Sequence, residues 1–274
     1  MGPVTSYGAL VVVQASLVAL PVRPWRMASS RLLGLVIPAS TLVVGVAIAR
    51  ASGGADFLTA LATIATPLLA AGAGWARGWR APWAAVPASA GLYLIAWREP
   101  GTAGDAAGVL LISGACLTAA AVVAALAPEA WLTVGLIGLV ILDCVFVWGD
   151  RQVGPAMQAL QGATPPSVGT STPLPALQQA EFGTATMGWL DFAAPALLAI
   201  LVRHRLRAAV ATGVAAGLWG LLLLVTSPIA ATPPVLAGLA AGRVRSAPWS
   251  GWRSRGPEGS SAPSSAVRSP GASS

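Results

Sequence analysis

The sequence predicts an all-α fold, a polytopic membrane protein with about nine transmembrane helices. Composition is the first reason, because 55% of the 274 residues are hydrophobic and only 9% are charged, whereas soluble domains carry about 25% charged residues. The second reason is that long apolar runs recur along the chain. A helix needs roughly 17 to 25 such residues to cross the hydrocarbon core of a bilayer. These two features exclude an ordinary water-soluble fold.

Nine apolar segments are predicted to span or nearly span the membrane. The first has no basic residue ahead of its apolar run, so we expect a retained helix rather than a cleaved signal peptide. The fourth and the ninth are short. In chain order the segments are 4–22, 31–49, 56–74, 82–97, 105–126, 130–148, 183–202, 208–226 and 228–242.

Arginine placement predicts the orientation of these spans. All 16 basic residues are arginine, and the chain contains no asparagine, a bias typical of a GC-rich bacterial genome. Alternating loops place thirteen arginines on one side and three, Arg50, Arg98 and Arg151, on the other. Cytoplasmic loops carry the excess positive charge, so we expect the N-terminus outside and the C-terminus in the cytoplasm. Arginines scattered in this way argue against nucleic-acid binding, despite the net charge of +7.

The chain is predicted to divide into three regions. Residues 1–130 form an N-terminal membrane scaffold of five helices, and residues 131–242 form a second membrane region. The second region contains a polar, proline-rich external loop at 149–182. Residues 243–274 lose all hydrophobic periodicity and consist largely of Ser, Pro, Gly and Arg, so we expect a disordered cytoplasmic tail that touches anionic lipid.

Two acidic residues stand out, because Asp143 and Asp191 are predicted to have apolar helix on both sides. An ionised aspartate near the bilayer centre costs at least about 2.5 to 3.5 kcal/mol, so it is seldom there without a partner or a role. No arginine is predicted to lie within the membrane interior, where it could neutralise either one. We therefore expect the two carboxyl groups to face each other and to share a proton, as paired carboxylates do.

Two carboxyl groups that share a proton can act together as a general base and a general acid. One carboxylate can take a proton from water as the water attacks an amide carbon, while the other, as the acid, donates a hydrogen bond to the carbonyl oxygen. Gly188 is predicted on the same helix face as Asp191, where it removes side-chain bulk. Pro195, four residues after Asp191, is predicted to weaken the backbone bonding of that turn and to leave carbonyl groups free.

Three segments resemble the intramembrane aspartyl proteases, the presenilin and signal peptide peptidase family. They are "LD" at 142–143, "GWLDFAAPALLAILVRHR" from 188 and "TPPVLAG" from 232. They resemble, in the family's order, its YD, GxGD and PAL helices, and nine spans agree with the family's architecture. The resemblance implies that residues 131–242 are the catalytic region. Asp143 and Asp191 would be the catalytic aspartates, beside a motif made by Leu142, Gly188, Trp189, Leu190, Pro234, Val235 and Leu236.

This sequence departs from the family pattern at three positions. Leu142 replaces the tyrosine, Leu190 replaces the second glycine of GxGD, and Val235 replaces the alanine of PAL. A branched side chain at Leu190, beside the aspartate, can narrow substrate access. The outside N-terminus resembles the signal peptide peptidase branch, which implies single-span or remnant signal-peptide substrates of type II orientation, with their N-terminus in the cytoplasm.

Two alternatives remain open. The aspartates can be the proton relay of a proton-coupled transporter, although inverted repeats with paired broken helices are not evident in the sequence. They can also be structural, in an inactive homologue that acts as a membrane scaffold. His204 is the only histidine and lies in a predicted loop, so neither an HExxH zinc site nor a Ser-His dyad within the membrane can be built. No cofactor is implied.

Overall fold

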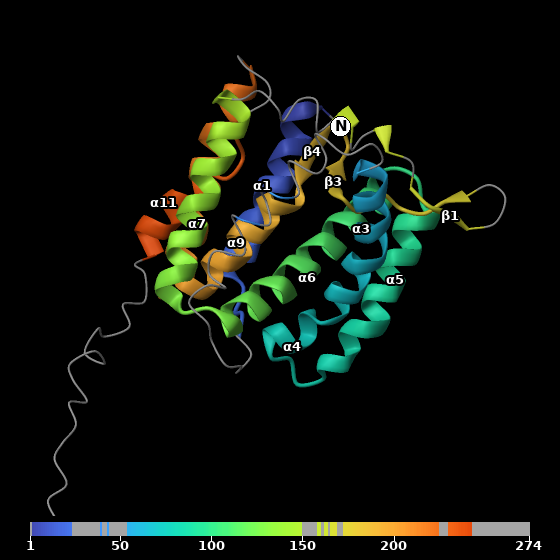
Figure 1. The fold of residues 1–274 in the computed structure, drawn as a ribbon, viewed down its shortest axis with the longest axis horizontal. Coiled ribbons are helices and arrows are strands. Elements are labelled where there is room, and N and C mark those ends of the chain that lie inside the picture. Colours follow the sequence, from blue (N-terminus) through green and yellow to red (C-terminus); the bar gives the residue numbers. More distant parts are fainter. Residues whose placement is uncertain are drawn as a thin grey trace, which may run out of the picture.

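The computed structural model describes residues 2–23, 39, 43, 54–149, 158–159, 162–163, 165–168, 172–224 and 230–242. Over these residues the protein is mostly helical, and the helices gather into one bundle (Figure 1). The predicted second span at 31–49 lies outside the described residues except for Ala39 and Val43, which are helical. The predicted tail at 243–274 lies outside them entirely.

Each of the other eight predicted spans overlaps a described helix. Two short 3₁₀ turns, Pro82–Ala84 and Leu221–Leu224, and a π-helical turn, Val145–Gly149, adjoin the α-helices. The helices are α1 (Pro3–Ala19), α3 (Gly54–Ala71), α4 (Ala73–Arg77), α5 (Ala85–Arg98), α6 (Thr102–Leu126), α7 (Glu129–Cys144), α9 (Trp189–Leu201), α10 (Arg205–Gly220) and α11 (Pro234–Gly242).

Three helices of the described part are long and apolar enough to cross a membrane. They are Gly54–Ala71, Thr102–Leu126 and Glu129–Trp148, and two shorter apolar helices are Pro3–Ala19 and Trp189–Leu201. The prediction of a helical membrane protein is supported at this coarse level, and the count of nine spans is not confirmed. Several predicted spans form shorter helices than expected, since proline and glycine residues, or a strand in the case of α9, interrupt them.

Four short strands correct the all-α prediction. β1 (Ser167–Val168) pairs antiparallel with β2 (Thr172–Pro173), and β3 (Gln179–Phe182) pairs antiparallel with β4 (Ala185–Gly188). Gly183 turns the second hairpin with φ 61°, a conformation that favours glycine. The predicted seventh span at 183–202 is therefore helical only from Trp189, and its first residues form the second strand of a hairpin.

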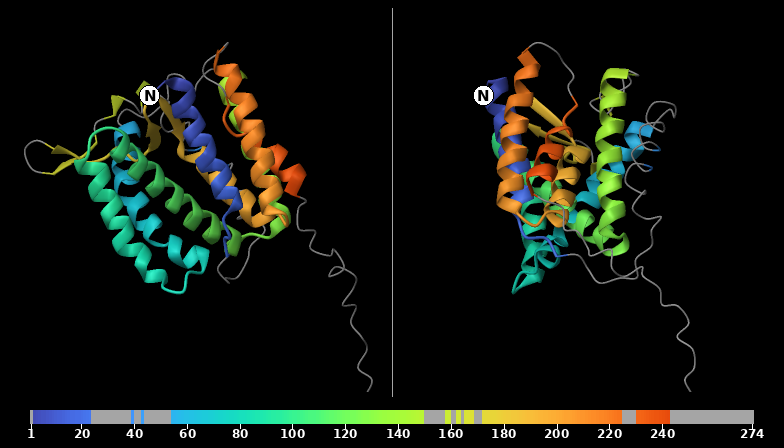
Figure 2. Two further views of the ribbon diagram at one scale, coloured as in Figure 1. Left: turned by 180° about the vertical axis from the view of Figure 1, so that it is seen from behind. Right: turned by 90° about the vertical axis from the view of Figure 1, so that its left-hand side faces the viewer.

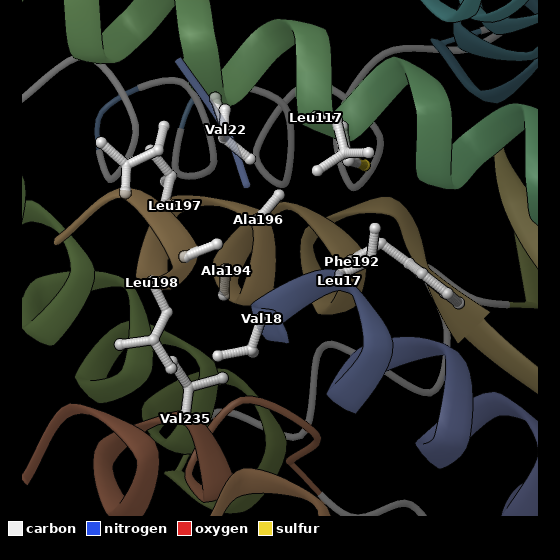
Figure 3. Packing of buried hydrophobic residues seen from close by; sticks show 14 of the residues in the cluster. Leu17, Val18, Val22, Leu117, Phe192, Ala194, Ala196, Leu197, Leu198 and Val235 are labelled. Carbon is white, nitrogen blue, oxygen red and sulfur yellow. The ribbon is translucent and has the colours of Figure 1, made fainter. Parts of the chain in front are cut away.

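Helix α9 lies at the centre of the bundle. It contacts α1, α6, α7 and α11, which surround it (Figure 2). Phe192 and every residue from Ala194 to Leu201 are buried. Figure 3 shows how residues of α1 and α6 pack around α9, with Val18 and Leu117 reaching it from different helices, while Val235 of α11 lies near Leu198.

Two glycines spaced as GxxxG, Gly238 and Gly242, bring α11 close to its neighbours. A Cβ at Gly238 would collide with the Thr212 hydroxyl of α10, and one at Gly242 would lie 2.7 Å from Cβ of Val202. A second pair with the same spacing, Gly213 and Gly217 of α10, makes only one close contact, because Gly213 meets Ala15 of α1 whereas Gly217 has nothing within 4 Å. Close packing of small residues is what holds helices together in lipid.

Candidate functional site

Asp191 lies in the first turn of α9, which corrects the prediction that it lies inside a continuous helix. Gly188 is the last residue of β4 and precedes the helix with φ −70° and ψ 161°, so it does not share a helix face with Asp191. Its N–H donates to Oδ2 of Asp191 over 2.8 Å. The carboxyl group thus satisfies a main-chain donor at the helix start, where four N–H groups have no helical partner.

Pro195 leaves a second main-chain group at this turn without its helical hydrogen bond. Proline has no N–H, so the main-chain carbonyl four residues earlier, that of Asp191, loses its helical hydrogen bond. Gln14 of α1 supplies the missing donor, since its Nε2 lies 2.9 Å from the Asp191 carbonyl oxygen. Gln14 is only 4% exposed. The prediction that Pro195 frees a carbonyl is therefore confirmed, and Gln14 is the partner that the sequence analysis missed.

Asp143 is held by the segment that leads into α11. Its Oδ2 accepts hydrogen bonds from the Thr232 hydroxyl at 2.7 Å and from the Thr232 N–H at 3.1 Å. Thr232 is 1% exposed and stands two residues before Pro234, the first residue of α11. The sequence analysis did not single out this threonine. A polar residue next to the Pro-Pro pair of an otherwise apolar segment is the signal that points to it.

Two tryptophans fix the loop that carries Thr232. The indole Nε1 of Trp219, on α10, donates to the carbonyl oxygen of Ala230 over 2.7 Å. The same indole lies against Trp148 of the π-helical turn after Asp143, with ring centroids 5.9 Å apart and planes at 51°. The segment that follows Asp143 contains one tryptophan of this pair, and the segment that precedes Thr232 is hydrogen-bonded to the other.

The two carboxyl groups lie close enough for their charges to interact. They come from helices in contact with each other, α7 and α9. Cys144 lies near Asp143, while Tyr7 and Cys116 lie near Asp191. The part of the chain that the structure describes shows no ion pair to either carboxyl group. The arrangement therefore juxtaposes two acids without a neutralising cation.

The remaining predicted site residues take different positions. Pro234 and Val235 are buried at the start of α11, whereas Leu236 is 38% exposed. Trp189 and Leu190 are half-buried and pack against the main hydrophobic core, and Leu142 is half-buried on α7. The Sγ of Cys116, on α6, lies 3.5 Å from the carbonyl oxygen of Trp189. The structure thus places Gly188 and the start of the 232–236 segment at the aspartates, and not Leu236.

Within the described ranges, no three His, Cys, Asp or Glu side chains lie together so that they could hold a metal ion. His204 is exposed just before α10, where its main-chain N–H donates to the carbonyl oxygen of Gly242. Comparison with protein-family models, curated proteins and solved structures finds no match for this chain.

Replacing Gln14 by Leu is expected to destabilise the protein by about 1 to 3 kcal/mol, because it leaves the buried carbonyl of Asp191 without a donor. Pro195→Ala restores a main-chain N–H to that carbonyl. The double variant Gln14→Leu/Pro195→Ala should therefore recover most of the loss. Thermal unfolding of the purified protein in detergent measures both effects, and equal destabilisation in the single and double variants would contradict the assignment.

Replacing either aspartate by Asn is expected to leave the folded protein at least as stable as wild type. Asn keeps an oxygen acceptor for Gly188 or Thr232 and removes a charge from an apolar site. Asp191→Leu, in contrast, leaves the Gly188 N–H unsatisfied and should cost about 1 to 3 kcal/mol. Unfolding midpoints compare the three variants. If both Asn variants lose as much stability as Asp191→Leu, the charges are structural.

Proposed function

We propose that this membrane protein is an intramembrane aspartyl protease that hydrolyses peptide bonds in transmembrane helices or remnant signal peptides. The observation that carries the proposal is the pair of carboxyl groups, Asp143 near the end of α7 and Asp191 in the first turn of α9, which lie close enough for their charges to interact. Acidic residues in such a setting are costly and tend to be functional. Two carboxyl groups that share a proton can supply both the general acid and the general base that hydrolysis of an amide requires.

Hydrogen bonding at the site supports different roles for the two oxygens of each carboxyl group, one bound within the protein and the other available for the reaction. Oδ2 of Asp143 binds Thr232 and Oδ2 of Asp191 binds Gly188, so the two Oδ1 atoms are the ones to engage water and substrate. The ionised carboxyl group takes a proton from water as the water oxygen bonds to the amide carbon. The protonated carboxyl group gives its proton to the carbonyl oxygen. The first carboxyl group then gives the proton that it took from water to the amide nitrogen, the second takes back a proton from a hydroxyl group of the tetrahedral intermediate, and the carbon–nitrogen bond breaks.

Helix lengths support a place in the membrane interior for both aspartates. Asp143 lies about 21 Å along α7 from Glu129, and Asp191 lies about 15 Å along α9 from Leu201, at a rise of 1.5 Å per residue. The start of α7 and the end of α9 lie at the same end of the bundle (Figure 1). A hydrocarbon core about 30 Å thick then has both carboxyl groups in its interior.

The loops meet in a way that supports the proposed orientation. At one end, Arg205 donates to the carbonyl oxygen of Val22 and the N–H of Arg23 donates to that of Ala76. These residues belong to loops that the arginine count places in the cytoplasm. At the other end, the hairpin residues Gly183 and Thr184 bond to Asp105 and Ser6. An outside N-terminus agrees with substrates of type II orientation.

Strand β4 supports an extended substrate. It pairs with β3 on one edge only among the described strands, and it leads through Gly188 directly to Asp191. An extended peptide that added to the other edge would have its main chain aligned by hydrogen bonds. A peptide bond must be exposed from its helix before water can attack it, and pairing with a strand would stabilise that unwound form.

Cleavage of a tagged type II single-span substrate by the purified protein is the direct test. Wild-type protein should release product, and Asp143→Asn and Asp191→Asn should each lower the rate by about 100-fold or more, since a general acid or base contributes 10²- to 10⁴-fold. Product appears on gels and its cut site by mass spectrometry. The same single-span helix in the reversed orientation should be a poor substrate if the N-terminus is outside. Equal cleavage by wild type and both variants would refute the proposal.

Thr232 is expected to position Asp143 during the reaction. Thr232→Val keeps the main-chain bond and the shape of the side chain but loses the hydroxyl donor, so kcat should fall by about 10- to 100-fold, the equivalent of one hydrogen bond to a charged group. KM should change little because Thr232 does not bind substrate. Thr232→Ser, the matched control, should retain most of the rate. A loss of rate in both variants, with normal folding, would contradict a role for the hydroxyl.

A further inference from the structure

A cavity of about 370 Å³ lies away from the aspartates, between α1, α3, α4, α5 and α6. Its walls are almost entirely apolar and include Leu17, Leu92, Leu110 and Leu117. Small residues, Ala73 and Gly114 among them, keep the space open. This volume is within the range of about 300 to 1,000 Å³ of small-molecule sites.

Two polar groups of the lining have no hydrogen-bond partner among the described residues. Ser113 is 6% exposed, and its buried Oγ is unsatisfied. Arg77 also lines the cavity, and its buried Nε is unsatisfied. Buried polar atoms are nearly always paired, so an unsatisfied hydroxyl group and an unsatisfied guanidinium N–H in one cavity indicate a missing partner that accepts hydrogen bonds.

The cavity has a cationic end. The Arg77 guanidinium lies 5.3 Å from the centroid of the Trp79 ring. The Arg23 side chain lies beside Gly78, the residue that follows Arg77, since its Cδ is 2.8 Å from the position of a Cβ built on that glycine. The structure shows no carboxylate paired with Arg77 in the ranges it describes. An apolar chamber with an unpaired guanidinium at its end complements a molecule with an apolar chain and an anionic head.

We propose that this cavity binds one acyl chain of an anionic membrane phospholipid, with the lipid phosphate on Arg77. Arginine is the side chain best suited to phosphate, because its planar fork donates two parallel hydrogen bonds. Arg77 is the last residue of the short helix α4, which follows α3, and it lies on the arginine-rich end of the bundle, where the arginine count places the cytoplasmic leaflet and its headgroups. The apolar walls take the chain, and the site is independent of the two aspartates and of the proposed proteolysis.

Native mass spectrometry of the full chain in detergent, titrated with phosphatidylglycerol or phosphatidylcholine, tests the proposal. Wild-type protein should retain one phosphatidylglycerol about tenfold more tightly than phosphatidylcholine, the discrimination expected of a charged hydrogen bond. Arg77→Gln should remove this preference. Arg80→Gln, an exposed arginine three residues on that does not line the cavity, is the matched control and should keep it.

A second pair of variants tests the chamber itself. Ala88→Phe places a ring in the cavity wall and should abolish retention of both lipids, whereas Ala90→Phe, on the same helix but outside the lining, should not. Unfolding midpoints show that each variant is folded, and the alanine pair decides the outcome if Arg77→Gln does not fold. The proposal is overturned if no saturable phosphatidylglycerol binding occurs, as it would be if another part of this chain filled the cavity. It is also overturned if Arg80→Gln acts like Arg77→Gln. Inorganic phosphate that binds equally well to wild type and Ala88→Phe would show a free-anion site instead.

Discussion

The hydrogen bond from Gln14 to the main-chain carbonyl of Asp191 meets the constraint on which the site depends. Every main-chain polar group in an apolar setting must have a partner within the protein. The start of α9 leaves main-chain groups without regular secondary-structure partners for three reasons. A strand ends there, a helix begins there, and Pro195 has no N–H to donate. Gln14 and the Asp191 carboxyl group resolve two of these demands directly, and the β3–β4 hairpin pairs the main chain of the strand.

Helix α9 is central because small residues allow it to be. Its Ala194, Ala196 and Ala199 are fully buried, and alanine permits neighbouring helices to approach closely where lipid offers no hydrophobic force between them. Helices α1, α6 and α7 contact α9, and each brings a polar or ionisable residue to its first turn. These are Gln14, Cys116 and Asp143. The same packing that buries the helix therefore assembles the groups around Asp191.

The surroundings of the two aspartates differ in kind. Asp191 is held by neighbours on its own chain segment and by α1, whereas Asp143 is held by Thr232, 89 positions later in the sequence. The indole of Trp219 holds the Ala230 carbonyl and contacts Trp148, so α7, α10 and the entry to α11 form one unit. A shift of α11 would be transmitted to the Asp143 carboxyl group through Thr232. The 232–236 segment is thus mechanically linked to one half of the pair, and the hairpin to the other.

Hydropathy and arginine spacing by themselves determined the helical membrane character and the order of the segments, since these depend on local composition. Asp143 and Asp191 could be singled out in the same way, because an acidic residue within an apolar stretch can be recognised from the sequence alone. The free carbonyl created by Pro195 was also predictable, as proline chemistry is local. The partners Gln14 and Thr232 were not predictable, because each lies far along the chain from the group it binds. The strand that replaces the first turn of the predicted seventh span was missed for a related reason. Residues 185–188 pair with 179–182 across a glycine turn, and that pairing outweighs an apolar pattern that reads equally well as helix.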